Sequence, residues 1–278
     1  MYIGSDSSTS TVTRVMAKGT QVYGVTSLGD EVFVARENCQ QKIEVYDANT
    51  LALQRHIKVP WIGDYLSGLA ACSHNNCLYA SDYDNDNIHR VDLSGSNAVM
   101  KWSVARGPVG LSVNNEHNLV VVSQDERKLL IFTTRGTLLQ DIVLAYRRTC
   151  MGTPSHAVQL STGTLLCSTM AAHDGCVSLV GVDGNDVRSS RRMRPKGLAV
   201  DREGRVLVAD KGKHRLLVLD QSLSIAGDMS VNVMGGLCGP YSLWYDRSRR
   251  RLYIGEWSGG RVIVIDNLKD FSMVAGTM

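Results

Sequence analysis

The chain alternates between short apolar runs and short polar segments rich in Gly, Asn and Asp. Typical apolar runs are EVFVA at 31–35, LVVVS at 119–123 and VLVAD at 206–210. Runs of this length that are rich in β-branched residues and bounded by turn-forming residues indicate β-strands rather than helices. The pattern therefore predicts an all-β fold that is built from many short strands.

The apolar runs recur in the same order at a spacing of 41 to 46 residues. Each unit begins at an anchor position, and the six anchors are Gly24, Gly68, Gly110, His156, Gly197 and Ser242. Four of the five prolines lie two residues before an anchor, namely Pro108, Pro154, Pro195 and Pro240. Each anchor is followed by a second apolar run, a third run and a more polar fourth segment. In five units the third run ends in an aspartate, namely Asp47, Asp92, Asp183, Asp220 and Asp266.

Six units of four predicted strands describe a six-bladed β-propeller. We expect a single domain over residues 1–278, with blades that start near residues 20, 64, 106, 150, 193 and 238. The last unit has few residues left for a fourth strand after Asp266, whereas residues 9–17 belong to no unit. We therefore predict that residues 9–17 form the outer strand of the last blade. This strand would close the ring and remove an exposed sheet edge.

The fifth unit contains a recognisable motif. It reads PKGLAVD at 195–201, GRVLVAD at 204–210 and KHR at 213–215. This motif resembles the NHL repeat, in which an Asn stands where this chain has Lys213. The other units keep parts of the pattern, so the resemblance extends over about residues 20–266. In particular, the chain is similar to the C-terminal propellers of TRIM-type ubiquitin ligases, although their zinc modules and coiled coil are absent from this sequence.

The propellers of that family recognise a protein partner or RNA and do no chemistry. The resemblance therefore implies a non-enzymatic recognition or scaffold domain that binds a protein or single-stranded RNA, and it suits the substrate-recognition part of a TRIM-like ligase. Two alternatives stay open. One is a propeller enzyme of the lactonase or lyase type with a metal in its channel, and the other is a structural scaffold without a dedicated site.

Candidate partner-binding residues come from loops that surround one mouth of the propeller channel. These loops precede the innermost strand of each blade or join its second and third strands. Basic residues with interleaved aromatics can contact phosphates and stack bases. The candidates are Tyr23, Tyr65, Arg106, Arg147, Arg148, Arg192, Arg194, Lys196, Lys211, Lys213, Tyr241 and Trp257. The alternative interpretation is a solvated face with ordinary hydrophobic rim residues.

Other charged residues are interpreted as structural or solvated. The resemblance implies that an acid at the end of the second strand pairs with an Arg of the third strand, and such bidentate pairs would stabilise a blade. The expected pairs are Asp82 with Arg90, Asp210 with Arg215, and Glu256 with Arg261. The run RRR at 249–251 lies in a predicted turn on the opposite face, and we interpret it as a solvated run.

No constellation for catalysis or metal binding emerges from the sequence. Of the seven histidines, His156 alone starts a predicted inner strand, and a metal site needs several convergent ligands. The acidic segment at 82–87 lacks the Gly and Glu of a calcium loop. Neither a G-x-S-x-G motif nor a phosphate-binding loop is present. We therefore expect no catalytic residue, no metal and no cofactor.

Composition refines these expectations in two ways. Residues 1–144 carry 12 Lys and Arg against 15 Asp and Glu, whereas residues 145–278 carry 18 against 12. The seven cysteines form no C-x-x-C pair, which favours a reduced, intracellular setting in which most of them act as small buried hydrophobes. The sequence contains no long apolar run and its start does not resemble a signal peptide. We expect a cytoplasmic protein without membrane contact that is a monomer as an isolated domain.

Overall fold

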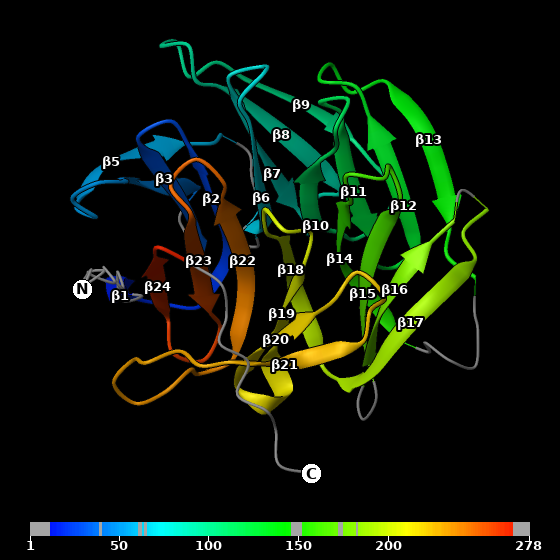
Figure 1. The fold of residues 1–278 in the computed structure, drawn as a ribbon. Coiled ribbons are helices and arrows are strands. Elements are labelled where there is room, and N and C mark those ends of the chain that lie inside the picture. Colours follow the sequence, from blue (N-terminus) through cyan, green and yellow to red (C-terminus); the bar gives the residue numbers. More distant parts are fainter. Residues whose placement is uncertain are drawn as a thin grey trace, which may run out of the picture.

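The computed structural model describes residues 12–38, 41–60, 63, 66–145, 152–171, 175–181 and 183–268. Over these residues it contains 24 β-strands and one short 3-10 helix, η1 (Lys211–Lys213). The strands form six four-stranded antiparallel sheets, which are arranged as the blades of a ring (Figure 1). The all-β, six-bladed propeller that the sequence predicts is therefore confirmed.

Three blades come from the first half of the chain, and each pairs its strands in sequence order from the channel outward. Blade 1 contains β2 (Val22–Leu28), β3 (Glu31–Arg36), β4 (Lys42–Asp47) and β5 (Leu53–Lys58). Blade 2 contains β6 (Leu66–Cys72), β7 (Cys77–Asp82), β8 (Asn87–Asp92) and β9 (Val99–Ser103). Blade 3 contains β10 (Pro108–Val113), β11 (Leu119–Ser123), β12 (Lys128–Phe132) and β13 (Leu138–Val143).

The other three blades follow the same plan, except that the last one borrows a strand. Blade 4 contains β14 (Thr153–Gln159), β15 (Leu165–Met170), β16 (Gly175–Val180) and β17 (Asp186–Met193). Blade 5 contains β18 (Pro195–Val200), β19 (Val206–Asp210), β20 (Arg215–Leu219) and β21 (Ile225–Met229). Blade 6 contains β22 (Pro240–Asp246), β23 (Arg251–Glu256), β24 (Arg261–Asp266) and the N-terminal strand β1 (Val12–Lys18).

The N-terminal strand closes the ring as predicted. Strand β1 pairs antiparallel with β24, with Val12 opposite Asp266 and Lys18 opposite Arg261. The Arg14 guanidinium strengthens this pairing, because its Nη2 lies 2.6 Å from Asp266 Oδ2. The predicted segment also included residues 9–11, which lie outside the described residues.

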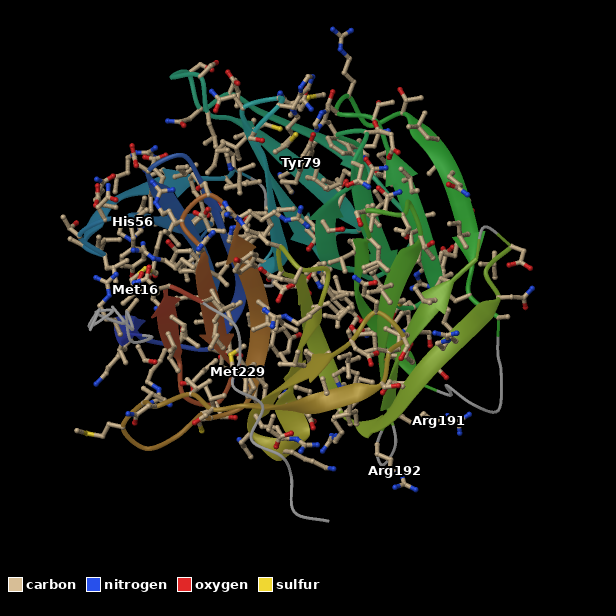
Figure 2. All side chains as sticks on the ribbon, viewed as in Figure 1. Met16, His56, Tyr79, Arg191, Arg192 and Met229 are labelled. Atoms are coloured by element: carbon tan, nitrogen blue, oxygen red, sulfur yellow. The ribbon has the colours of Figure 1, made fainter. Side chains whose placement is uncertain are left out.

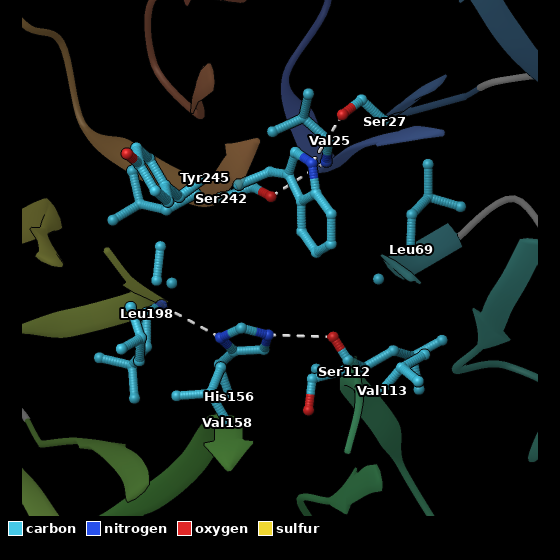
Figure 3. A pocket seen from close by; sticks show the side chains of 18 of the residues that line it. Val25, Ser27, Leu69, Ser112, Val113, His156, Val158, Leu198, Ser242 and Tyr245 are labelled. Carbon is cyan, nitrogen blue, oxygen red and sulfur yellow. Dashed lines mark hydrogen bonds between the residues drawn. The ribbon is translucent and has the colours of Figure 1, made fainter. Parts of the chain in front are cut away.

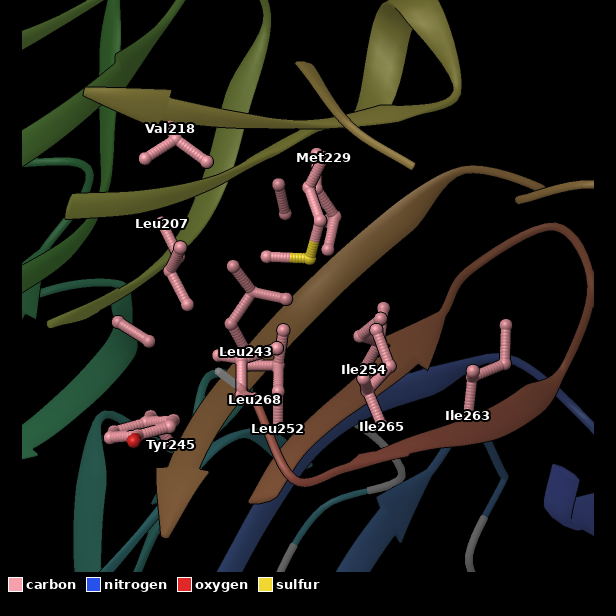
Figure 4. Close-up of a cluster of buried hydrophobic side chains, with 13 residues drawn as sticks. Leu207, Val218, Met229, Leu243, Tyr245, Leu252, Ile254, Ile263, Ile265 and Leu268 are labelled. Carbon is pink, nitrogen blue, oxygen red and sulfur yellow. The ribbon is translucent and has the colours of Figure 1, made fainter. Parts of the chain in front are cut away.

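The hydrophobic core is divided among the gaps between blades. In the described part of the chain six clusters of buried side chains are found, and each lies between two neighbouring blades. Figure 4 shows one of them, in which Leu207 and Val218 of blade 5 face Leu243 and Ile254 of blade 6. The second and third strands of a blade therefore pack on both faces. This explains why their sequences are continuous apolar runs rather than alternating ones.

Every inner strand is irregular at its anchor position. The pairing register shifts at the anchor in β2, β6, β10, β14, β18 and β22. At Gly68 an added Cβ would lie 2.3 Å from the carbonyl oxygen of Val109, and at Gly110 it would lie 2.3 Å from that of Ser155. The next blade thus approaches so closely that the anchor has no room for a side chain there, which is the physical reason for the Gly in the repeat.

Two of the three ion pairs expected from the resemblance are confirmed. Arg215 Nε donates to Asp210 Oδ2 at 3.0 Å. Arg261 Nε donates to Glu256 Oε2 at 2.5 Å. Asp210 also accepts the backbone N–H of Arg194 at 2.9 Å, so this pair joins the loop before β18 to β19 and β20.

The third expected pair, Asp82 with Arg90, is wrong. Asp82 Oδ2 instead lies 3.2 Å from Nε2 of the buried His89. Burial alone would raise the pKa of Asp82, but hydrogen bonds from His89 and Asn85 hold it below its ordinary value. In the pairing of β7 with β8, Arg90 lies opposite Tyr79, three rungs away from Asp82.

The interpretation of residues 249–251 as a solvated run is also wrong, although they do reach the β22–β23 turn as expected. Arg249 Nη2 lies 2.5 Å from Asp30 Oδ1 of blade 1, and Arg249 also donates to the Gly29 carbonyl at 2.6 Å. Arg251 Nε donates to Asp266 Oδ1 at 2.5 Å. Only Arg250 of the three is exposed. The run therefore joins blade 6 to blade 1 and holds β23 against β24.

Two further findings concern the surroundings in which the protein works. Within the described residues no helix is long and apolar enough to cross a membrane. Cys72, Cys77, Cys167 and Cys238 are free thiols, whereas Cys176 is disulfide-bonded. A disulfide is typical of oxidising compartments. The expectation of a reduced set of cysteines is therefore wrong for Cys176, and the cytoplasmic location stays a prediction.

Candidate site at the channel mouth

A cavity of about 450 Å³ lies at the centre of the ring, where the inner strands of all six blades face one another (Figure 3). Its walls are mainly apolar. Five lining residues directly follow an anchor, namely Val25, Leu69, Leu111, Leu198 and Leu243. A cavity of this size with apolar walls and a few polar groups is typical of ligand sites.

The residue just before each anchor forms a ring at one end of this cavity. The six ring residues are Tyr23, Ser67, Val109, Ser155, Lys196 and Tyr241, and all of them line the cavity. Each corresponds to the x of a Pro-x-Gly unit, and the bulge at the anchor aims it at the channel. Lys196 is the one charged member of the ring.

Lys196 is almost fully buried, with 9% of its surface exposed. Its Nζ lies 5.0 Å from the centroid of the Tyr241 ring, in the arrangement of a cation–π contact. Burial, and to a smaller extent the nearby Lys211, lower the pKa of Lys196 to about 8. In the described structure no carboxylate pairs with this amine. The ring therefore holds a cation that is shielded from water and lacks a counter-charge.

Aromatic side chains surround this lysine. The Tyr23 and Tyr241 rings meet edge to face with their centroids 5.6 Å apart. Lys211 Nζ lies 3.5 Å from the centroid of the Trp257 ring and 5.4 Å from that of Tyr241. We call Tyr23, Lys196, Lys211, Tyr241 and Trp257 the mouth cluster. The sequence predicted all five of them as partner-binding residues, and the structure brings them together.

Positive charge continues outward from the mouth cluster along blade 5. Arg192, Arg194 and Lys213 are exposed there, and we call them the basic edge. The Lys213 ammonium donates to the Arg192 carbonyl at 3.1 Å, and the backbone N–H of Lys211 donates to the Arg194 carbonyl at 3.1 Å. The loop before β18 and η1 are thus fastened together. Figure 2 shows the Arg192 side chain extending away from the end of β17.

The opposite side of the mouth is acidic. The β7–β8 and β11–β12 loops carry Asp84, Asp86, Asp125 and Glu126. Arg106, one of the predicted partner-binding residues, lies here, because its backbone N–H donates to Glu126 Oε1 at 3.4 Å. Arg106 is therefore separated from the mouth cluster and the basic edge, and shares this side with Arg127 and with Lys128, whose Nζ lies 3.1 Å from Glu126 Oε2. The remaining candidates, Tyr65, Arg147 and Arg148, lie outside the described residues.

His156 lines the same cavity but acts as a brace between blades (Figure 3). Its Nε2 lies 3.0 Å from the Leu111 carbonyl oxygen, and its Nδ1 accepts the backbone N–H of Leu198 at 3.0 Å. Burial lowers the pKa of His156, which favours the neutral ring that this arrangement requires. Both nitrogens are occupied, so His156 joins blades 3, 4 and 5. Within the described residues no group of three or more His, Cys, Asp and Glu side chains could hold a metal ion.

Two serine hydroxyls in the cavity were missed by the sequence reasoning. Ser155 Oγ and Ser112 Oγ are buried and have no hydrogen-bond partner among the described residues. Ser155 stands before the anchor His156, as Lys196 stands before its own anchor, so the repeat alignment could have identified it. Ser112 follows its anchor by two residues, and nothing in its sequence context distinguishes it.

Comparison with known proteins supports the fold and one motif. The NHL repeat family matches residues 193–219, which run from the end of β17 to the end of β20. No curated protein sequence matches the chain.

Solved structures with the same fold differ widely in sequence. Virginiamycin B lyase from Staphylococcus aureus has a TM-score of 0.66 with 9% identity, over 93% of this chain and 100% of that chain. A gluconolactonase-like protein has a TM-score of 0.70 with 14% identity, over 93% of this chain and 92% of that chain. Hydrazine synthase from Kuenenia stuttgartiensis has a TM-score of 0.67 with 13% identity, over 97% of this chain and 100% of that chain.

At these identities the likeness concerns the fold alone. The similarity to TRIM-type ligases, which the sequence suggested, has no counterpart among these matches. The ring of six blades and the repeat motif in the fifth blade agree with each other. The protein is therefore a six-bladed β-propeller that contains an NHL repeat in its fifth blade.

Proposed function

We propose that the protein is a non-enzymatic recognition domain that binds a protein partner through the mouth cluster and the basic edge. The observation that carries this proposal is the grouping of lysines, arginines and aromatic rings on one side of the channel mouth. Aromatic and Arg side chains are enriched where protein interfaces gain most of their binding energy. If the propeller is the substrate-recognition part of a ubiquitin ligase, the substrate protein would bind to this same surface.

The surface suits an acidic protein segment better than single-stranded RNA. Base stacking needs an open ring face, and one face of Tyr241 and of Trp257 is already occupied by a lysine. In addition, the acidic loops of blades 2 and 3 repel a long polyanion that crosses the mouth. A protein segment can place acidic residues on the basic edge and other residues on the acidic side.

The test is capture of partners by the purified propeller from an extract of the source cells. The wild type is compared with Trp257→Ala and with the double variant Arg194→Glu plus Lys196→Glu. Arg135→Glu serves as a matched control, because Arg135 is exposed in the β12–β13 turn, away from the mouth. We expect both mouth variants to lose a specific protein more than tenfold while the control retains it. Equal capture by all forms would refute the proposal. Capture of RNA alone would mean that the partner is an RNA rather than a protein.

The alternative is a propeller enzyme of the lyase or lactonase type. It is supported by the central cavity and by the fold that the chain shares with virginiamycin B lyase, of which a catalytically inactive histidine variant is known with quinupristin. In this chain His156 uses both ring nitrogens to hold blades together. Metal analysis of the purified protein separates the two proposals, because stoichiometric Ca²⁺ or Zn²⁺ would favour the enzyme.

We further propose a monomeric protein in the cytoplasm. The disulfide at Cys176 is the observation that opposes this location. Alkylation of thiols during cell lysis tests it, because the cytoplasmic proposal predicts that Cys176 is labelled as a free thiol. An oxidised Cys176 in such a lysate would point to an oxidising compartment instead.

A further inference from the structure

The channel contains two hydroxyls without a hydrogen-bond partner among the described residues, and one ammonium group whose printed contact is an aromatic ring. The Lys196 amine has no carboxylate, and the Ser155 and Ser112 hydroxyls have no hydrogen-bond acceptor or donor. All three residues line the cavity. Buried polar groups are normally paired, so two unpaired hydroxyls and an ammonium group without a carboxylate in one cavity call for a physical explanation.

These groups are arranged in order along the cavity. Lys196 and Ser155 occupy neighbouring places in the ring, because they precede the anchors of the adjacent blades 5 and 4. Ser112 belongs to β10, two residues beyond the anchor Gly110 and thus farther from the ring. The walls between them are apolar, with Leu111, Val158 and Leu198 among the lining residues.

His156 does not compete for a ligand in this space. Its two ring nitrogens already contact the Leu111 carbonyl and the Leu198 N–H. The cavity therefore offers one cation and one unpaired hydroxyl at its ring end and an apolar middle with the Ser112 hydroxyl. Its far end is polar, with Asn115, Gln159, Asp246, Arg247 and Arg249 among the lining residues. An ammonium group and a hydroxyl on neighbouring blades can each donate to one oxygen of a carboxylate, which is an anionic acceptor.

We propose that the propeller channel binds a small carboxylic acid with an apolar body. The carboxylate accepts hydrogen bonds from Lys196 Nζ and Ser155 Oγ at the ring, and the apolar body fills the cavity beyond. Ser112 Oγ gives a polar contact to ligands that reach that far. This site goes beyond the proposed recognition of a protein at the mouth, because it lies inside the channel and does not involve Trp257 or the basic edge.

The size and chemistry of the cavity limit the ligand. A volume of about 450 Å³ falls in the range of small-molecule pockets, which bury most of the surface of their ligand. A neutral molecule of the same shape would leave the Lys196 charge without a partner, and a cationic one would be repelled by it. Selection should therefore depend on the charge of the head group.

The experiment is calorimetric titration of the purified protein with octanoate, 1-octanol and octylamine. We expect octanoate to bind at least tenfold more tightly than 1-octanol and octylamine not to bind. Lys196→Met should reduce octanoate affinity at least tenfold, to the level of 1-octanol, and Ser155→Ala should reduce it several-fold. Lys58→Met is the matched control, because Lys58 is an exposed lysine on β5, the outer strand of blade 1, and it should bind octanoate like the wild type.

Several outcomes would overturn the proposal. They are no binding of octanoate at millimolar concentration, equal binding of octanoate and 1-octanol, or wild-type affinity in Lys196→Met. Thermal unfolding of each variant shows that it is folded, and Ser155→Ala provides a second test should Lys196→Met fail to fold. A short peptide with a free C-terminal Leu is titrated as a separate arm of the experiment. If only this peptide binds, the carboxylate belongs to a chain terminus and the small-molecule assignment is wrong.

The two proposals fail in different ways. Trp257→Ala should abolish capture of the protein partner without changing octanoate binding, since Trp257 does not line the cavity. Loss of both activities in Trp257→Ala would mean that there is one site rather than two.

Discussion

The buried Lys196 ammonium group contributes an unfavourable free energy to the folded state, and the rest of the molecule compensates for it. The five equivalent positions in the ring hold Tyr, Ser, Val, Ser and Tyr, so the geometry itself does not require a cation there. Burial lowers the pKa of Lys196 to about 8 from an ordinary 10.5. A difference of this size corresponds to roughly 3 kcal/mol of unfavourable free energy at neutral pH. A residue that costs stability at a position open to other residues is typical of a functional role.

We predict that Lys196→Met raises the free energy of unfolding by about 2 kcal/mol at pH 7, since it removes a desolvated charge but also a cation–π contact. Below pH 8 the folded wild type carries the full penalty. Between about pH 8 and 10.4 the folded state has released the proton and the unfolded state still holds it, so the wild type gains stability as pH rises and the difference shrinks.

Denaturant unfolding of both forms from pH 6 to 10 measures this difference. The groups that face Lys196 are Lys211, which is also a lysine, and the rings of Tyr23 and Tyr241. Lys213→Met, an exposed counterpart, should change stability by less than about 0.5 kcal/mol at every pH. A difference between the wild type and Lys196→Met that does not vary with pH would contradict the assignment of a desolvated amine.

At the scale of strands, the hydrophobic pattern was sufficient to predict the blades, because each strand of a propeller contacts mainly its neighbours in sequence. The ion pairs depended on register, which the pattern does not contain. In the two confirmed pairs, Asp210 with Arg215 and Glu256 with Arg261, five residues separate the partners. Eight residues separate Asp82 from Arg90. Attention to that spacing would have excluded the wrong pair.

At the anchor glycines of the inner strands, the loss of stability on substitution by Ala should depend on how closely the neighbouring atoms approach. Gly68→Ala and Gly110→Ala should each destabilise the protein by about 2–3 kcal/mol, because the new Cβ would lie 2.3 Å from a carbonyl oxygen of the next blade. Gly24→Ala should cost less, since its closest contact is 2.9 Å. Chemical denaturation of the three variants checks the order. An equal cost at all three sites would mean that backbone freedom, not close approach, explains the glycines.

The closing strand β1 gives the second prediction at this scale. Deleting residues 1–19 should lower the melting temperature by more than 10 °C, because it exposes the edge of β24 and removes the Arg14–Asp266 ion pair. Deleting residues 1–8 leaves β1 intact and should have little effect. Calorimetry of the two truncated forms measures this. A melting temperature that is unchanged without β1 would show that the ring does not depend on closure by this strand.

At the scale of the whole molecule, the repeat alignment predicted where the mouth lies but not how its charges are divided. The basic residues of blades 5 and 6 were identified from the sequence because they occupy equivalent loops. The acidic residues of blades 2 and 3 occupy equivalent loops too, so they belong to the same surface. Burial of Lys196 and the unpaired Ser155 and Ser112 hydroxyls depend on packing between blades. One repeat unit contains no information on that packing.

The division of charge across the mouth predicts how the protein responds to a polyanion. A fluorescent oligouridylate should bind the wild type only weakly, because its far end meets Asp125 and Glu126 after its near end has contacted the basic edge. Asp125→Asn with Glu126→Gln should tighten this binding several-fold, and Arg194→Glu with Lys213→Glu should abolish it. Substitution of Glu116 by Gln should have no effect, because Glu116 is an exposed acid in the β10–β11 turn on the far face.

Fluorescence anisotropy between 50 and 300 mM salt measures oligouridylate binding by all four forms. Tight wild-type binding that weakens steeply with salt, unchanged by the Asp125 and Glu126 substitutions, would mean that the acidic side does not face the ligand and that the mouth is an RNA site.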